Sequence, residues 1–196
     1  MKKVIPRDAV LIPDQAKNVF EGVIYDVYQW PQKMHDGSEA AFEMLRRPDT
    51  VEVIGVADGK LLVIDDDQPH SGSKTSFPGG RVDAEDSSIL TAAQREMLEE
   101  TGYEFEQWRL VSVRQLHTKI EWFIHFFLAF NGQQTTEPHL DAGEKITMSL
   151  KPFNEVKQMS QDGVGHLGES RHLFDGLLSL EDLLALPAFN GQKVDR

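Results

Sequence analysis

The feature that most constrains the fold is one helix-forming segment, ended by a glycine, that carries three glutamates near its C-terminal end. Residues from about Ser87 to Thr101 are predicted to form an α-helix, and Gly102 is a typical C-terminal stop. On this helix Glu96, Glu99 and Glu100 are spaced i, i+3 and i+4, so their side chains share one face. The fold is therefore expected to place this acidic face beside a cleft.

Three carboxylates at this position indicate a bound cation. Like charges at these spacings destabilise a helix, and the helix dipole disfavours anions near the C-terminal end. Hard divalent ions such as Mg²⁺ prefer oxygen ligands and complete their coordination shell with phosphate oxygens of a substrate. An apolar stripe of Leu90, Ala93 and Met97 lies beside the acidic face and allows the helix to pack. The alternative for the two adjacent glutamates alone is a solvated helix with a charged face.

The segment around this helix resembles the Nudix box. That box has Gly, five residues, Glu, seven residues, Arg-Glu, an aliphatic residue, any residue, Glu-Glu, any residue and Gly. Gly80 matches the first position, and the run Arg95–Gly102 matches the second half without a mismatch. The isolated Glu of the pattern falls on Asp86, with Glu85 beside it, and eight residues instead of seven precede the arginine. Whether Glu85 or Asp86 supports the metal-binding half stays open.

The resemblance implies a fold and a chemistry. The expected fold is α/β, a Nudix-type α/β/α sandwich with a mixed β-sheet and an N-terminal antiparallel β element. Nudix enzymes hydrolyse nucleoside diphosphates linked to another moiety by attack of water on phosphorus, with Mg²⁺ (or Mn²⁺) as cofactor. The metal ligands implied are Glu96, Glu99, Glu100 and the backbone carbonyl of Gly79 or Gly80.

Two further residues acquire roles through the same resemblance. Arg95 is expected to orient the acidic cluster, since it precedes the cluster and can hold a carboxylate by a bidentate bond. Glu144, in a loop before a predicted strand, is the expected general base. The alternative for Glu144 is an ordinary exposed loop acid.

β-Strand patterns lie on both sides of the helix. Two β-branched runs, Val51–Ala57 and Lys60–Ile64, are joined by Asp58–Gly59 and predict a hairpin. Residues 65–76 are polar and contain Pro and Gly, which predicts a loop. Further strands are expected after the helix, at 108–116, 121–130 and 145–150.

Two helical stretches are predicted to close the chain. The last opens at Ser179, Asp182 follows three residues later as in a capping box, and the helix stops before Pro187. The order of strands, helix, strands and helices indicates a mixed sheet covered by helices.

Residues 1–47 are predicted to form a β-rich element that precedes a Nudix domain over residues 48–196. A strand is expected from Phe20 to Gln29, a turn at 35–38 and a returning strand from Ala41 to Leu45. A lone two-stranded hairpin cannot cover both of its faces. Its apolar side chains are therefore expected to pack on the core, on a partner, or on both.

This element also resembles the N-terminal element of ADP-ribose and ADP-sugar pyrophosphatases. The motifs are Val19–Gly22 and Phe42–Arg47. In that branch the element exchanges with a partner subunit and helps bind the adenosine end of the substrate, which implies a homodimer. Tyr28 or Trp30 is then expected to stack on adenine, and Arg46 or Arg47 to contact base or phosphate. The alternative for Trp30 is hydrophobic packing at a strand end.

One departure from that branch concerns the phosphates. The branch commonly carries an arginine a few residues after the second hairpin strand, whereas this chain has three aspartates, Asp65–Asp67. Arg114 or Lys74 is the expected substitute. Three adjacent aspartates would repel an anionic substrate unless they point away from it or bind metal themselves.

The composition limits the partners. A formal net charge of -12 argues against a general nucleic-acid binder, because such proteins usually carry a basic surface. No apolar run approaches the ~20 residues of a membrane span. The absence of cysteine excludes disulfides and thiolate metal sites. The chain is therefore expected to be cytoplasmic, with no nucleic-acid partner and no membrane. The Nudix resemblance implies a small-molecule nucleotide as its substrate.

Two other functions are open alternatives. A Nudix-fold sensor would bind a nucleotide sugar without catalysis, although such proteins usually degrade the box, which this chain retains. A house-cleaning enzyme would act on free nucleoside triphosphates, although such chains tend to be shorter and to lack the N-terminal hairpin. The box determines the cleavage reaction and not the group attached to the nucleoside diphosphate, so the exact substrate stays undetermined at this point.

Overall fold

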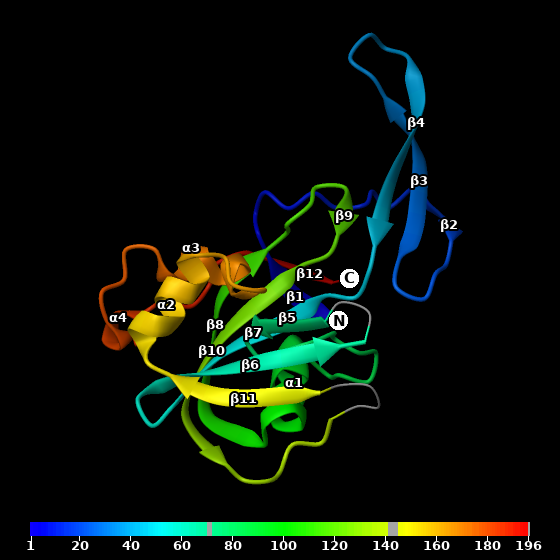
Figure 1. Ribbon diagram of the computed structural model, residues 1–196. Helices are drawn as coiled ribbons and strands as arrows, with labels where there is room; N and C mark the ends of the chain where they lie inside the picture. Colours follow the sequence, from blue (N-terminus) through cyan, green and yellow to red (C-terminus); the bar gives the residue numbers. More distant parts are fainter. Residues whose placement is uncertain (70–71, 141–144, 196) are drawn as a thin grey trace.

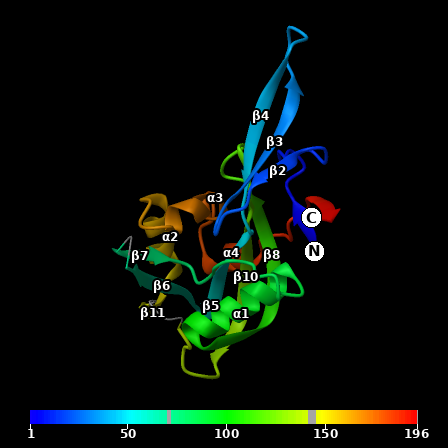
Figure 2. The ribbon, with the colours of Figure 1, turned by 90° about the vertical axis from the view of Figure 1, so that its right-hand side faces the viewer.

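The computed structural model describes residues 1–69, 72–140 and 145–195. A central six-stranded sheet carries α1 on one face and α2, α3 and α4 on the other, and a long hairpin projects from this body (Figure 1, Figure 2). The predicted α/β/α sandwich with an N-terminal antiparallel element is thereby confirmed. Within these ranges, no helix has the length and apolar character needed to cross a membrane.

The central sheet is mixed. Its strands run in the order β11-β6-β5-β10-β8, and β7 pairs with β6 beside this path. β5 and β10 are parallel, whereas the other pairs are antiparallel. The bounds are β5 Thr50–Ala57, β6 Lys60–Gln68, β7 Gly72–Ser76, β8 Tyr103–Arg114, β10 Ile124–Gln134 and β11 Ile146–Lys151. The predicted hairpin at 51–64 and the strands after the helix are confirmed, and β8 begins earlier than expected.

Alternating side chains of the central strands supply two hydrophobic cores. On β5, Val51 and Val53 lie in the core formed with α1. Ile54 and Val56 lie in the opposite core, which is covered by α2 (Phe153–Gln161), η1 (Leu167–Ser170) and α3 (Arg171–Phe174). Successive strand residues point to opposite faces. These four residues therefore show which face of the sheet each remaining β5 side chain points to.

Helix α1 spans Ile89–Thr101, as predicted. The Ser88 hydroxyl accepts a hydrogen bond from the Thr91 N–H at its start. Gly102, with φ of 72°, adopts the left-handed conformation that ends the helix. The other helical segments are α2 Phe153–Gln161, η1 Leu167–Ser170, α3 Arg171–Phe174 and α4 Leu180–Leu184. The predicted capping box of Ser179 and Asp182 is present at the start of α4.

The projecting element is a second sheet with strand order β2-β3-β4-β9. Its strands are β2 Lys17–Phe20, β3 Asp26–Lys33, β4 Glu39–Arg46 and β9 Ile120–Glu121. The prediction of one strand over residues 20–29 is wrong, because the chain turns between β2 and β3. The Gly22 N–H donates to the Asp26 carboxylate (3.3 Å) across this turn. A side chain at Gly22 would collide with the Tyr25 carbonyl, so the turn requires glycine.

The prediction of a loop over residues 65–76 is also wrong. β6 continues to Gln68, and β7 pairs with it antiparallel. Polar side chains face each other across this pair, and the Thr75 hydroxyl donates to Asp65 (2.6 Å). β7 lies at an edge of the sheet, where charged and polar residues are common and no hydrophobic alternation is needed, so its sequence is similar to that of a loop.

The two terminal segments of the described chain pair with each other. β1 (Lys2–Ile5) and β12 (Gln192–Asp195) are antiparallel. Ile5 is fully buried and packs with Val113 and Phe123 of the body. The first 47 residues are therefore divided between the projecting hairpin and the body.

A buried ionic network fixes the start of β5. The Asp49 carboxylate accepts hydrogen bonds from Lys3 Nζ (2.7 Å), the Phe123 N–H (3.1 Å) and His125 Nε2 (3.1 Å). The Asp49 carbonyl accepts from the Val82 N–H (2.9 Å). Burial opposes ionisation of Asp49, but the bond from His125 and the charge of Lys3 outweigh it, so the pKa of Asp49 lies below its usual range. Asp49 thus joins the N-terminal strand, β10 and the loop before α1.

Asp49→Asn is expected to lower the free energy of unfolding at pH 7 by about 3 kcal/mol, because it leaves the largely buried Lys3 without its counter-charge. Since the folded pKa is lowered, the contribution of Asp49 is complete above its unfolded pKa of about 4. It is lost as the pH falls through the folded value. Urea unfolding of both proteins at pH 7 and pH 3 measures this, with the exposed Asp8→Asn as control. The variant should lose less stability on acidification than the unmodified protein; an equal loss would refute the assignment.

Candidate active site

A glycine turn before α1 is held against β5. The Val53 N–H donates to the Pro78 carbonyl (2.8 Å), and the Val51 N–H donates to the Gly80 carbonyl (2.9 Å). Between them, Gly79 has φ of 153°, and a Cβ there would lie 2.0 Å from the Val51 carbonyl oxygen. Only glycine fits this contact, so the turn brings its backbone directly over the strand.

The three glutamates of α1 lie under this turn. The Gly79 N–H donates to Glu100 Oε2 (2.8 Å), and Glu100 is buried. A Cβ on Gly80 would lie 2.6 Å from the Glu96 carboxylate, so the glycine allows that carboxylate to approach the backbone. Glu99 is the most open of the three, with 46% of its side chain exposed. All three line one pocket of about 340 Å³, so they share a cleft.

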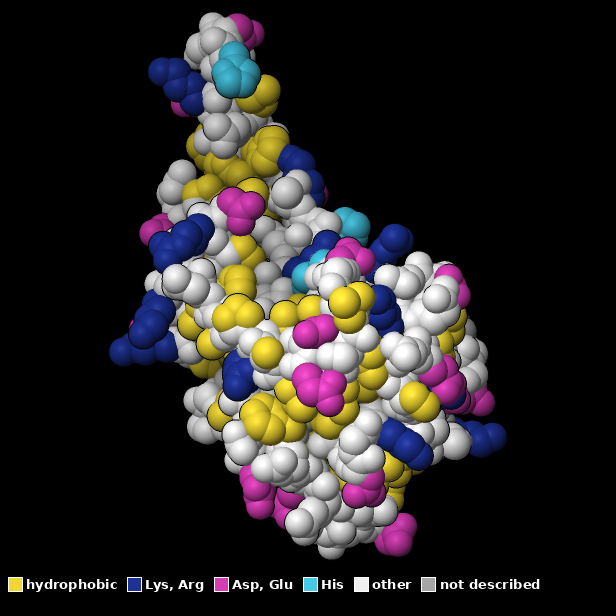
Figure 3. Space-filling model, turned by 90° about the vertical axis from the view of Figure 1, so that its left-hand side faces the viewer, with side chains coloured by type: hydrophobic (Ala, Val, Ile, Leu, Met, Phe, Trp, Pro, Cys, Tyr) yellow, Lys and Arg dark blue, Asp and Glu magenta, His cyan; other side chains and the backbone are white. Residues whose placement is uncertain are grey.

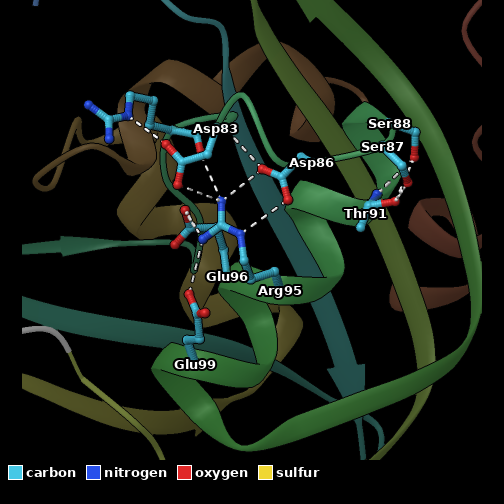
Figure 4. Close-up of polar contacts among 9 residues, drawn as sticks. Asp83, Asp86, Ser87, Ser88, Thr91, Arg95, Glu96 and Glu99 are labelled. Atoms are coloured by element: carbon cyan, nitrogen blue, oxygen red, sulfur yellow. Dashed lines mark hydrogen bonds and ion pairs between the residues drawn. The ribbon is translucent and has the colours of Figure 1, made fainter. Parts of the chain in front are cut away.

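Arg95 lies at the centre of the acidic cluster, as Figure 4 shows. One guanidinium nitrogen, NH1, donates to Glu96 (2.9 Å) and to Glu99 (3.0 Å). The other, NH2, donates to Asp86 (3.0 Å) and to the carbonyl of Arg81 (3.0 Å). Arg95 therefore fixes the positions of two carboxylates and connects them to the loop that precedes the helix.

Asp86, and not Glu85, is the loop acid that contacts this cluster. Asp86 is buried, accepts two bonds from Arg95 and also accepts from the Asp83 N–H (2.9 Å). The bond from Arg95 holds the pKa of Asp86 below its usual range. Glu85 is exposed. The geometry therefore favours Asp86 for the position that the sequence leaves open.

The donor set of this pocket suits a hard divalent cation. Its acidic groups offer oxygen atoms only, and burial raises the pKa of Glu96 to about 7 against the opposing charge of Arg95. A bound cation would stabilise the ionised form of a carboxyl in such surroundings. Within residues 1–69, 72–140 and 145–195, no three acidic or histidine side chains already surround one point. Arg95 instead contacts both Glu96 and Glu99.

The candidate backbone ligands differ in what they contact. The Gly80 carbonyl already accepts a hydrogen bond from Val51. A carbonyl oxygen has two lone pairs, so this bond leaves one for a further partner. Gly79 donates its N–H to Glu100 and lines the same pocket. Glu144, the expected base, lies outside the described residues.

The acidic pocket also contains residues for which the sequence predicts no definite role. Arg81 lines it with a half-exposed side chain that donates to Asp83 (2.9 Å). Asp66 is the only one of the three adjacent aspartates among its lining residues, and His139 also contributes. The position of Arg81 directly after the glycine pair was an available signal. Asp66 and His139 reach the pocket through strand pairing and a backbone bond of His139 to Glu99, which no local pattern reveals.

Arg46 and Arg47 line a second pocket, of about 380 Å³, at the base of the hairpin. Arg46 donates to the buried Glu121 (Nε, 3.2 Å) and to the Tyr28 hydroxyl (3.1 Å). The Arg47 guanidinium lies 4.7 Å from the centre of the Trp122 ring, and its Nε is buried without a hydrogen-bond partner in the described chain. Each arginine is thus held against an aromatic ring.

The two pockets share a wall formed by the residues after the glycine turn. Arg81 and Asp83 line the acidic pocket, whereas Val82 between them lines the pocket of Arg46 and Arg47. This alternation is that of an extended backbone, in keeping with the bridge between Thr50 and Arg81. A ligand that occupies both pockets would therefore cross the edge of this wall.

The remaining predicted substrate residues lie elsewhere. Trp30 is buried with Ile12 and Met44, and its indole N–H donates to Gln32 (3.0 Å), which corresponds to the packing alternative. Arg114 donates to the Glu169 carbonyl (3.0 Å) and does not line the acidic pocket. Lys74 is exposed on β7 and does not line it either.

A family model and a solved structure match this chain. The family model described as NUDIX domain matches residues 46–167. A crystal structure of an ADP compounds hydrolase aligns with a TM-score of 0.62 and 17% sequence identity, over 76% of this chain and 82% of that chain. At that identity the likeness shows the fold. No sequence among curated proteins matches this chain significantly.

Proposed function

This chain belongs to the Nudix domain family, and we propose that it is a divalent-metal-dependent hydrolase which cleaves the pyrophosphate bond of a nucleoside diphosphate linked to another group. ADP-ribose or an ADP-sugar is the proposed substrate class. The observation that carries the proposal is the pocket in which Glu96, Glu99 and Glu100 meet the glycine turn. The helix dipole disfavours carboxylates at the C-terminal end of a helix. A bound cation would offset this unfavourable placement of negative charge.

The glutamates, the glycine turn and Arg95 each have a defined part in this proposal. Glu96, Glu99 and Glu100 would hold Mg²⁺ or Mn²⁺, together with the carbonyl of Gly79 or Gly80. When bound, the ion supplies the positive charge that neutralises the pyrophosphate and activates water for attack on phosphorus. Arg95 is the positioning residue for Glu96 and Glu99.

Arg81 is proposed to contact the phosphates in place of the arginine that this chain lacks after its second hairpin strand. It lines the acidic pocket, and its side chain is 56% exposed. A guanidinium suits phosphate oxygens because of its planar array of donors. Arg114 and Lys74, which do not line this pocket, are less suited to that part.

The second pocket supports a nucleotide substrate of this class. It shares a wall with the acidic pocket and offers the arginines Arg46 and Arg47. We propose that they contact the base or phosphate of the adenosine end, with Tyr28 beside Arg46. Trp30 would stack on adenine only after leaving its buried position. The structural neighbour is an ADP compounds hydrolase, which agrees with an ADP-containing substrate.

A hydrolysis screen tests the function. The purified protein is incubated with ADP-ribose, ADP-sugars, dinucleoside polyphosphates, NADH and nucleoside triphosphates, with Mg²⁺, with Mn²⁺ and with a chelator. We expect metal-dependent release of AMP from ADP-ribose or an ADP-sugar. Preference for triphosphates would support the house-cleaning alternative. Binding of a nucleotide sugar without hydrolysis under any metal would support the sensor alternative.

Asp86→Asn is expected to lower kcat/KM by about tenfold or more, because residues that orient metal ligands typically matter at that level. The change removes the ionic partner that fixes Arg95. Glu85→Gln is the matched control and should leave kcat/KM unchanged, since Glu85 is exposed. Steady-state kinetics over a Mg²⁺ titration measures both. A loss confined to Glu85→Gln would reverse the assignment.

Glu144→Gln is expected to lose rate while keeping metal affinity, if this residue is the general base. Single-turnover rates and Mn²⁺ binding followed by electron spin resonance separate the two quantities. A normal rate would move the base to another residue.

A cytoplasmic location and the absence of nucleic-acid and membrane partners stay predictions.

A further inference from the structure

Glu52 is an acidic residue of β5 that the proposed chemistry does not use. It lies between Val51 and Val53, whose N–H groups hold the glycine turn, and its Cα would lie 2.9 Å from a Cβ on Gly79. Its side chain belongs to the same sheet face as Ile54, opposite the face covered by α1. Glu52 therefore stands behind the glycine turn, on the other side of the sheet from the metal-binding glutamates.

The Glu52 carboxyl lacks a complete set of partners. Its Oε2 is buried and has no hydrogen-bond partner in the described part of the chain. Buried polar side-chain atoms in native proteins are nearly always hydrogen-bonded, so such an atom calls for an explanation. A ligand that supplies the missing bond is one explanation that chemistry allows.

The neighbouring groups on this face are polar and already paired. Arg114 and His172 Nδ1 lie 3.0 and 3.2 Å from the Glu169 carbonyl oxygen, and Ser112 is 2.8 Å from His172 Nε2. Burial raises the pKa of Glu52 to about 8, and the nearby charge of Glu169 adds to that effect. At neutral pH the Glu52 carboxyl is therefore largely uncharged and Glu169 carries the nearby negative charge, so the group that Glu52 hydrogen-bonds should itself be uncharged.

The surface of this face is hollowed where the hairpin meets the body. Figure 3 views the molecule from the side of α2 and α3, and basic, acidic and histidine side chains border the hollow. Strand pairing places polar residues near one another on this face. Glu52 of β5 is paired with Phe126 of β10, and Phe126 is paired with Ser112 of β8, so two polar residues flank Phe126. Glu52 thus belongs to a polar end of an otherwise apolar sheet face.

We propose that Glu52 is a specificity-determining residue that hydrogen-bonds an uncharged donor group of the substrate, a sugar hydroxyl or the amino group of the base. This inference rests on the proposed function, since it takes the substrate to pass the glycine turn. The residue does not take part in bond cleavage. It selects which group flanks the pyrophosphate.

Binding of the two product halves tests the proposal without relying on catalysis. AMP and ribose 5-phosphate are each titrated calorimetrically, with Mg²⁺, into the unmodified protein, Glu52→Met, Glu52→Gln and the exposed control Glu104→Gln. Glu52→Met should weaken binding of one half by about tenfold or more, the effect of losing a hydrogen bond to a carboxyl. Loss of AMP affinity assigns the contact to the nucleoside, and loss of ribose 5-phosphate affinity assigns it to the second sugar. Glu52→Gln keeps hydrogen-bonding capacity and should lose less.

Thermal unfolding distinguishes a ligand contact from damage to the fold. Because Glu52→Met removes a buried carboxyl that lacks a partner, the ligand-free variant should unfold about 2–4 °C higher than the unmodified protein. A lower melting temperature, or affinities for both halves unchanged from the unmodified protein, would overturn the proposal. ADP-ribose hydrolysis with unchanged affinities in Glu52→Met would sink this inference alone. Altered affinities in a protein that hydrolyses none of the tested compounds would sink only the proposed function.

Discussion

Glu99→Gln is expected to lower kcat by at least about a hundredfold at saturating Mg²⁺, because the charge of a metal ligand acts on the transition state. Glu99 is the most exposed of the three glutamates, so it is free to turn toward a bound ion. The amide keeps the shape of the side chain and removes its charge. Steady-state kinetics with a metal titration measures the effect.

The stability of this variant separates catalysis from folding. In the described structure Glu99 makes one partly exposed ion pair, with Arg95 at 3.0 Å, and such pairs contribute about 1 kcal/mol or less. Glu99→Gln should therefore unfold in urea nearly as the unmodified protein does. Glu104→Gln, an exposed acid on β8, is the control for charge alone. Near-normal turnover of Glu99→Gln at saturating metal would end the assignment.

The intact chain is expected to form a homodimer through the projecting hairpin, and Phe20→Asp combined with Val23→Asp is expected to make it monomeric. The hairpin stands away from the body (Figure 2), and the face seen in Figure 3 carries apolar side chains along it. Val23 is 97% exposed, Phe20 60% and Ile24 55%, whereas Trp30 and Met44 are already buried inside the element. Closed two-fold dimers are the commonest oligomers, and an exposed apolar surface of this kind favours one.

Light scattering over a range of protein concentrations measures this association. Leu178→Asp is the matched control, because Leu178 is also apolar and 82% exposed but lies between α3 and α4. A chain that starts near Thr50 is a poorer test, since it also loses Ile5 and Lys3 from the body. A monomeric intact chain at micromolar concentration would refute the dimer. A dimer that survives the double substitution would move the interface to another surface.

Local signals account for the parts of the fold that the sequence predicts well. The helix from Ile89 to Thr101 has a capping serine and a terminal glycine, and its glutamates are ordered by helical spacing alone. The hairpin of β5 and β6 follows from Asp58–Gly59 in the same way. Such features depend on residues that are close in the chain.

Long-range pairing accounts for what the sequence does not predict. β7 is polar because it lies at an edge, and the pairing of β1 with β12 joins opposite ends of the described chain. In the candidate site, Asp66 lines the acidic pocket because of its register on β6, whereas the adjacent Asp65 and Asp67 do not. The sequence does not distinguish these three aspartates. Trp30 is of a residue type that often stacks on ligands, which the sequence alone suggests. The structure shows instead that Ile12 packs against it and covers it.

The shared wall between the two pockets limits how the chain can change in length. Along Arg81, Val82 and Asp83, one inserted residue would exchange the sides that the following residues face, so both pockets would lose their lining at once. The extra residue that distinguishes this chain from the Nudix pattern lies between Asp86 and Arg95, beyond the wall. There the irregular Ser87–Ser88 segment absorbs it before the helix begins. A substitution in the wall would therefore change the lining of one pocket, whereas an insertion there would change the lining of both.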